Sequence, residues 1–212
     1  MNIALIGTGF VGAAVLDELL QRGHRVTVLA RSPEKIAARD GLTVVAADAQ
    51  DAPQVAAAVR GHDAVISAYN PGWTVPDIYD QFLRGTSAIL DGVRTAGIKR
   101  VLVVGGAGSL FVAPGVQLVD TPDFPAEWKS GALAARDALT RLREQKDLEW
   151  TFLSPPILLQ PGERTGRYRL GTEAPLMNGD QPGSISVADL AVALVDEVEV
   201  PSHVRQRFTV AH

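Results

Sequence analysis

The sequence predicts a doubly wound α/β fold, in which helices cover both faces of a parallel sheet. Short apolar runs alternate along the chain with longer stretches of helical spacing. Most of the runs are apolar at consecutive positions, which is typical of strands buried on both faces of a parallel sheet. The 212 residues, 46% of them hydrophobic, suffice for one domain with a substantial core.

Six apolar runs rich in valine and isoleucine are the predicted strands. They span residues 3–6, 26–30, 42–47, 64–67, 101–104 and 151–153. Three stretches between them place apolar residues three and four positions apart, the spacing of one helical face. These stretches predict helices at 11–22, 78–95 and 129–145. Strands and helices that alternate in this way favour a doubly wound sheet with right-handed crossovers.

After residue 153 the regular alternation ends. Prolines and glycines predict loops there, and residues 164–170 are expected to form one arm of a hairpin. A last helix is predicted at 187–198, begun by Ser186, and a last strand at 207–210. The long segment 155–184 follows the carboxyl end of a strand, where ligands bind in this architecture. We therefore expect residues 155–185 to be a small substrate-side extension of a single domain spanning residues 1–212.

Charge and composition exclude several classes of function. The 20 basic and 24 acidic residues give a net charge of −4, which excludes nucleic-acid binding through a generally basic surface. Without cysteine there are no disulfides, thiolate metal sites or cysteine nucleophiles, and the four histidines lack metal-motif spacing. Glycine or proline interrupts the uncharged stretches 1–16 and 101–119, so neither a signal peptide nor a membrane helix is expected. We expect a cytoplasmic protein, and no apolar stripe is assignable to a subunit interface.

A glycine-rich turn joins the first predicted strand to the first predicted helix. It reads Gly7-Thr8-Gly9-Phe10-Val11-Gly12. In this context Gly7 permits a tight turn, Gly9 lets the backbone approach a pyrophosphate, and Gly12 lets the helix lie close to the sheet. The helix N-terminus would present free N–H groups to the phosphates. The turn predicts a Rossmann-type dinucleotide site, with a purely structural turn as the alternative.

The end of the second predicted strand favours NADP(H), with NAD(H) as the alternative cofactor. NAD-specific sites place an acidic residue about 20 positions after the glycine turn, whereas this chain has Ala30-Arg31-Ser32 there. Arg31 could bind a 2′-phosphate through its planar guanidinium, with the Ser32 hydroxyl and the Lys35 charge nearby. The alternative is that Arg31 is a solvated strand end and that Ser32 only caps the next helix.

Two further strand ends supply candidate cofactor ligands. Asp48 could accept a hydrogen bond from the adenine amine, with Ala49 packing nearby, and a turn or capping role is the alternative. Ala68 and Tyr69 follow the fourth run at the expected switch point of the sheet. There we expect Tyr69 to line the cofactor rather than merely to cover the sheet end.

Taken together, these residues resemble the atypical short-chain dehydrogenase/reductase superfamily. Within it they are most similar to the subgroup named NADH-flavin reductases, and more distantly to biliverdin reductase B and NmrA-like proteins. The similarity spans essentially the whole chain, through the glycine turn and residues 101–110, 150–156, 161–171, 189–197 and 207–210. It implies a single Rossmann domain with a small substrate-binding extension, and it adds Gly106 and Pro155 to the expected cofactor contacts.

The chain departs from the superfamily at the catalytic pair. Typical members use a tyrosine, with a lysine four residues later, as the proton-donor pair. Here Trp128 stands at the tyrosine position and Ala132 at the lysine position. Tryptophan cannot donate a catalytic proton, and Lys129 points to another part of the helix surface. Carbonyl and alcohol chemistry, which needs a positioned acid or base, is therefore disfavoured.

Flavin reduction is less affected by this loss. Hydride transfer to the flavin N5 forms a delocalised anion that needs no side-chain acid at that moment, so the protein mainly stacks two rings. We expect an NAD(P)H-dependent reductase that uses FMN or FAD as substrate, or a flavin-like or quinone acceptor. Trp128, Phe111 and Tyr69 are candidates to line the acceptor pocket, with plain packing as the alternative. Ser109 is a candidate catalytic-site hydrogen-bond donor to the nicotinamide or substrate, with a loop role as the alternative.

Some alternatives stay open. Arg164, Arg167 and Arg169 could hold a flavin phosphate or an acidic substrate, or they are simply solvated. The missing tyrosine–lysine pair also permits an NADP(H)-binding sensor that regulates a partner without turnover. A sugar or small-molecule epimerase is a third function, which the same missing pair disfavours.

Overall fold

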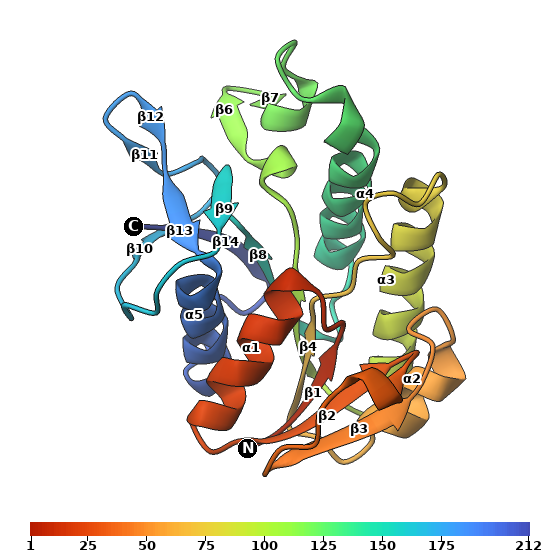
Figure 1. Ribbon diagram of the computed structural model, residues 1–212. Coiled ribbons are helices and arrows are strands. Elements are labelled where there is room, and N and C mark those ends of the chain that lie inside the picture. The colour runs from red at the N-terminus through yellow and green to blue at the C-terminus, as the bar shows by residue number, and fades with distance from the viewer.

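The centre of the structure is a mostly parallel sheet of eight strands (Figure 1). The structure is a computed structural model and describes all 212 residues. The strands of this sheet are β1 (Asn2–Ile6), β2 (Arg25–Ala30), β3 (Leu42–Ala46), β4 (Ala64–Ser67), β5 (Arg100–Val104), β8 (Glu149–Ser154), β10 (Arg169–Gly171) and β14 (Gln206–Ala211). Their spatial order is β10-β14-β8-β5-β4-β1-β2-β3, and only β10 runs antiparallel to its neighbour. The predicted doubly wound parallel sheet is confirmed.

Helices cover both faces of the sheet. They are α1 (Phe10–Gln21), α2 (Ala52–Val59), α3 (Ile78–Thr95), α4 (Ala126–Arg143) and α5 (Val187–Glu199). Helices α1 and α5 pack together on one face, while α2, α3 and α4 lie in sequence across the other (Figure 1). The sequence pattern does not predict α2, because its eight residues are too few for a clear helical period. No helix combines the length and the apolar character needed to cross a membrane.

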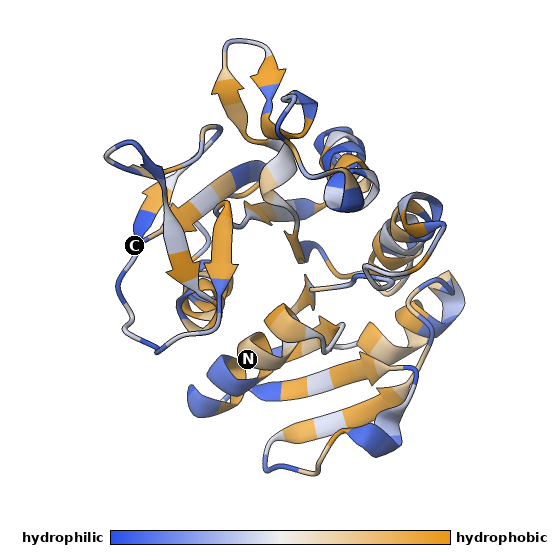
Figure 2. Ribbon diagram, turned by 45° about the horizontal axis from the view of Figure 1, so that its top comes forward, coloured by the Kyte–Doolittle hydropathy of each residue, from blue (hydrophilic) through white to orange (hydrophobic).

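Each face of the sheet has its own hydrophobic core. Along β1, Ile3 and Leu5 pack into the core under α1 and α5, whereas Ala4 and Ile6 pack into the core under α2, α3 and α4. Both sets of side chains are buried, which explains why the strand is apolar at consecutive positions. Figure 2 shows the hydrophobic strands inside the layer of helices and the hydrophilic residues on the outer helix surfaces.

The chain reverses its direction of winding between β1 and β4. From β1 it proceeds outward to β2 and β3, then returns to β4 on the other side of β1 and continues to β5, β8 and β14. The register places Ile6, the last residue of β1, beside Ser67, the last residue of β4. The carboxyl ends of these two strands, called the switch point below, are where doubly wound sheets bind ligands.

Residues 155–185 do not continue the alternation of strands and helices. The prediction of a hairpin arm at 164–170 is wrong. Only its end, in β10, is a strand, and β10 pairs with β14. The buried carboxylate of Asp189 accepts the backbone N–H groups of Thr165 and Gly166, which replaces strand pairing there. Short strand pairs complete the upper part of the structure: β9 (Leu158–Gln160) with β13 (Ser184–Ser186), β11 (Met177–Asn178) with β12 (Gln181–Pro182), and β6 (Phe111–Ala113) with β7 (Val116–Gln117).

A buried charge network joins β5, β8 and α5 at the amino edge of the sheet. The Arg100 guanidinium donates to Glu197 Oε1 at 2.8 Å and to Thr151 Oγ1 at 2.7 Å. Glu197 also accepts the backbone N–H groups of Ser202 and His203 and pairs with the His203 ring. Burial by itself raises the pKa of the Glu197 carboxyl, but the hydrogen bonds from His203 and Ser202 together lower it by more, so the net pKa lies below its ordinary value.

We predict that Glu197→Gln lowers the free energy of unfolding at pH 7 by about 3 kcal/mol, because Arg100 then stays buried without its charged partner. The folded pKa of Glu197 lies below the unfolded value of about 4.3, so the stabilisation is complete above that pH. It disappears as the pH falls through the folded pKa. Urea unfolding of both proteins between pH 7 and pH 3 should therefore show a difference that shrinks in acid.

Glu144→Gln is the control for this series, because Glu144 is exposed at the end of α4 and its carboxyl forms no ion pair. It should leave the free energy of unfolding unchanged at every pH. A difference between wild type and Glu197→Gln that stays constant down to pH 3 would contradict the role assigned to the carboxylate.

Candidate functional site

The glycine turn joins β1 to α1 at the switch point, and the fold itself requires two of its glycines. Gly7 has a φ of +94°, and a Cβ there would lie 2.5 Å from the Ala68 carbonyl oxygen. A Cβ on Gly12 would lie 1.9 Å from the Gly7 carbonyl oxygen. Without side chains at these positions, α1 begins directly against the end of the strand.

Gly9 is different, because nothing in the protein requires a glycine there. Its φ of −71° and ψ of −161° are open to any residue, and a Cβ would meet no atom within 4 Å. Gly9 is exposed and precedes the first residue of α1. The absence of a side chain at Gly9 leaves the backbone open to the close approach that a pyrophosphate requires.

The N-terminus of α1 offers hydrogen-bond donors to such a ligand. No side chain caps the helix, and its first turn contains no acidic residue. The first N–H groups of a helix have no intrahelical partners, and here no side chain replaces them. No acidic side chain in the first turn neutralises the positive end of the helix dipole. Thr8 and Val11 are half-buried beside this end, and Phe10 is exposed. The residues present thus fit the phosphates of a dinucleotide.

The end of β2 presents a cation and a hydroxyl that the protein does not use. Arg31 is exposed and takes part in no ion pair. Ser32 precedes a short 3₁₀ helix, Pro33–Lys35, but its hydroxyl makes no capping hydrogen bond. The capping role considered for Ser32 is therefore absent, and both groups are available to an anion.

Asp48 and Tyr69 are both engaged by the protein. Asp48 Oδ1 accepts the Gln50 N–H at 2.9 Å, which is the turn role considered as the alternative, while Oδ2 has no protein partner. The Tyr69 ring packs on α3, where a Cβ on Gly85 would lie 2.3 Å from ring atom Cε1. Its hydroxyl donates to the Gln81 carbonyl oxygen at 3.2 Å. The Tyr69 ring thus packs on α3, and its backbone nitrogen lies beside Gly7 of the glycine turn.

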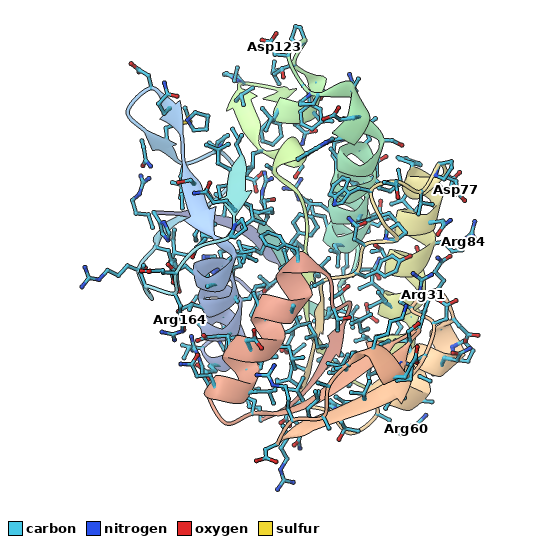
Figure 3. All side chains as sticks on the ribbon, viewed as in Figure 1. Arg31, Arg60, Asp77, Arg84, Asp123 and Arg164 are labelled. Atoms are coloured by element: carbon cyan, nitrogen blue, oxygen red, sulfur yellow. The ribbon has the colours of Figure 1, made fainter.

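Charged side chains gather on the β2–β3 side of the switch point. Burial raises the pKa of the Tyr69 phenol, and the charges of Asp48, Arg31 and Arg84 also act on it. Figure 3 shows Arg31, at the end of β2, and Arg84, on α3, on the same side of the molecule. Ala49 is partly buried and packs against the core under α2, α3 and α4. This side carries the first nucleotide of a dinucleotide in doubly wound folds.

Ser109 is not placed to contact a ligand. The residue is 1% exposed, and its Oγ accepts a hydrogen bond from Arg207 Nη1 at 3.2 Å. The same Nη1 donates to the Ser109 carbonyl oxygen, and the Arg207 guanidinium also pairs with Glu173 of the extension. The expectation that Ser109 contacts the nicotinamide or a substrate is corrected accordingly: its hydroxyl joins the loop after β5 to β14.

Trp128 lies at the surface on the first turn of α4. Its indole is beside that of Trp73, with 5.8 Å between ring centroids and 32° between planes. Trp73 lies in the loop after β4 and was not among the predicted residues, because a tryptophan in a loop carries no periodic signal. One turn further along α4, Ala132 packs against Gly108, just beyond the end of β5.

Gly106 and Pro155 follow β5 and β8 at the carboxyl edge of the sheet. Both are half-buried, and a Cβ on Gly106 would make only an ordinary contact with Ala135, at 3.6 Å. Phe111 is half-buried in β6, where its N–H donates to the Glu173 carbonyl oxygen. These residues border the β4–β5–β8 side of the site by position.

The three arginines of the extension do not form a common binding face. Arg164 donates to both carboxylate oxygens of Glu18 on α1, at 2.6 and 2.8 Å. Arg169 donates to the backbone carbonyl oxygen of His212, and Arg167 is exposed. Arg164 and Arg169 therefore hold segments of the fold together, a role that is neither ligand binding nor simple solvation, the two alternatives considered for them.

Comparison with known proteins agrees with this geometry. The family model described as NAD(P)H-binding matches residues 7–201 of the chain. Among solved structures, a protein from Burkholderia pseudomallei provisionally named an exported protein is 44% identical, with a TM-score of 0.90 and all of both chains covered. A provisional epimerase from Bacteroides thetaiotaomicron is 43% identical, with a TM-score of 0.93 over 100% of this chain and 96% of the other. A provisional NADH-flavin reductase from Streptococcus pneumoniae is 36% identical, with a TM-score of 0.88 over 100% and 99%.

These matches confirm the resemblance inferred from the sequence. The three similar structures carry three different descriptions, although the fold is shared along the whole chain. A shared fold supports many activities, so the chemistry has to be argued from the residues at the switch point.

A pair of glycine variants separates the role of the turn in folding from its role in binding. We predict that Gly9→Ala unfolds at the wild-type temperature but binds NADPH at least about tenfold more weakly, because its methyl group occupies the pyrophosphate space. Gly12→Ala should unfold at a lower temperature, because its Cβ collides with the Gly7 carbonyl group. Thermal unfolding and NADPH titration measure both effects. Unchanged NADPH affinity in folded Gly9→Ala would disprove the pyrophosphate placement.

Proposed function

The chain belongs to the NAD(P)H-binding family, and from this premise we propose that it is a reductase that passes hydride from NAD(P)H to a flavin or a flavin-like or quinone ring. One observation carries the proposal. The dinucleotide turn is complete, but an exposed tryptophan stands on α4 where a proton donor would be needed for carbonyl chemistry. This combination suits an acceptor that tolerates hydride before it receives a proton.

The residues at the start of α4 argue against a carbonyl or alcohol substrate. Trp128 has an indole N–H that does not release its proton, and the Ala132 methyl group packs against Gly108. An alkoxide would therefore have no positioned acid. NAD(P)H held at this site would supply the hydride, and the reduced acceptor ring would take its proton from water.

The chain's own groups divide the binding of the cofactor between them. The glycine turn and the α1 N-terminus hold the pyrophosphate through backbone N–H groups. Arg31 and Ser32 hold the 2′-phosphate, which gives NADPH preference over NADH. The free Oδ2 of Asp48 accepts the adenine amine, and Gly106 and Pro155 border the nicotinamide half.

A second function, NADP(H)-dependent regulation of a partner without turnover, is favoured by one observation. Ser109, the polar side chain expected nearest the reacting ring, is buried and engaged by Arg207. A protein that only senses the cofactor needs no such group. Epimerisation is disfavoured, because it needs a positioned acid and base that α4 does not provide.

The reductase proposal predicts that the purified protein oxidises NADPH faster than NADH, and only when FMN or another ring acceptor is added. Absorbance of the reduced nicotinamide measures turnover, and a parallel titration measures binding. Tight NADPH binding without oxidation by FMN, FAD or a naphthoquinone would reject the reductase and favour the regulator.

Cofactor choice has its own test. Arg31→Asp should weaken NADPH binding by at least about tenfold, because a charged hydrogen bond to phosphate is worth roughly 1.5–3 kcal/mol. NADH binding should remain within about twofold of wild type. Arg60→Asp makes the same change in charge at an exposed residue that precedes β4, at the amino edge of the sheet (Figure 3). Equal NADPH affinities for the two variants would refute the assignment of Arg31.

A further inference from the structure

Two of the three tryptophans are more than half exposed. Trp73 is 58% and Trp128 is 57% exposed, whereas Trp150 is 3% exposed in the core. The two exposed indoles lie side by side, with 5.8 Å between their centroids, and are called the tryptophan pair below. Such a contiguous aromatic surface is unfavourable in water, and exposed patches of this kind commonly mark binding sites.

The structure makes room for the tryptophan pair. Trp128 and Gly131 are three residues apart on α4 and therefore share one helix face. A Cβ on Gly131 would lie 2.7 Å from Trp73 Cζ3 and 3.0 Å from Ile78 Cδ1. Glycine inside a helix is less favourable than alanine. At this position it lets the Trp73 ring rest on the helix beside Trp128.

The tryptophan pair lies at the carboxyl edge of the sheet, on the β4–β5 side of the switch point. Trp73 is five residues after Ala68, so their Cα atoms are at most about 18 Å apart. Trp128 is one helical turn before Ala132, which packs against Gly108 just beyond β5. In doubly wound folds one half of the sheet carries each nucleotide, and β1–β3 carry the adenosine side. The tryptophan pair is thus on the side of the reacting nicotinamide.

We propose that the tryptophan pair is the platform on which the acceptor ring stacks. The acceptor is then a flat, conjugated, polycyclic ring, such as the isoalloxazine of FMN, because such a ring can stack on the exposed face of one indole while it contacts the tilted second indole. This identity rests on the proposed reductase function, whereas the binding surface itself rests on the exposure and contacts of the two rings. Trp73 and Gly131 become specificity-determining residues that no sequence pattern assigns.

Tryptophan fluorescence tests the proposal directly, because Trp150 is buried and serves as an internal baseline. FMN should quench the wild-type protein strongly, and the double variant Trp73→Ala/Trp128→Ala should retain only the weak Trp150 response. Each single variant, and Gly131→Ala, should raise the FMN Kd by about tenfold. NADPH affinity should stay within about twofold. Val200→Ala, an exposed apolar residue after α5, is the control that should change neither affinity.

The outcomes separate this proposal from the reductase proposal. Quenching that requires both tryptophans, without NADPH oxidation, supports the platform and rejects the reductase. FMN-dependent oxidation with unchanged FMN Kd and KM in Trp73→Ala and Trp128→Ala overturns the platform and leaves the reductase intact. Absence of quenching by FMN, FAD and a naphthoquinone also overturns it. So does light scattering that shows a wild-type dimer which Trp73→Ala dissociates, because the pair would then be a subunit interface.

Discussion

The close approach of α1 to the end of β1 is the constraint on which the rest of the site depends. A Cβ on Gly12 would lie 1.9 Å from the Gly7 carbonyl oxygen, and one on Gly7 would lie 2.5 Å from that of Ala68. Because neither side chain exists, the helix begins against the turn and aims its free N–H groups at the switch point. The same position lets α1 pack on α5, so the free helix N-terminus and one of the two cores depend on the same close approach.

The two edges of the sheet are built differently. At the amino edge, Glu197 pairs with both Arg100 and His203 in a largely buried network. At the carboxyl edge, Arg31 forms no ion pair, the Ser32 hydroxyl caps nothing, and the tryptophan pair is exposed. Unpaired groups of this kind do not stabilise a fold, but they are what a ligand needs. The charged groups at the amino edge are therefore paired within the fold, whereas the groups named at the carboxyl edge remain accessible to a ligand.

The proposed chemistry follows from the lack of a proton donor at the start of α4 and of a free hydroxyl at Ser109 after β5. By the family resemblance, Trp128 and Ala132 stand at the positions of the tyrosine–lysine pair, and Arg207 engages the Ser109 hydroxyl. An acceptor that delocalises the incoming charge over a ring avoids the need for a positioned acid. The three similar structures share the fold but carry three different descriptions, which is expected when function is set by side chains at the strand ends rather than by the sheet.

Local patterns in the sequence determined the parallel sheet, its long helices and the dinucleotide turn, because hydrophobic period and glycine spacing act over a few residues. The short helix α2 was not predicted, because its eight residues are too few to show a helical hydrophobic period. Only the tertiary structure determined that the Ser109 hydroxyl bonds to Arg207, which is 98 residues away in the sequence. It also decided the irregular path at 164–168, where Asp189 takes the backbone N–H groups, and the pairing of Trp73 with Trp128. These contacts join distant segments, and no local pattern encodes which segments meet.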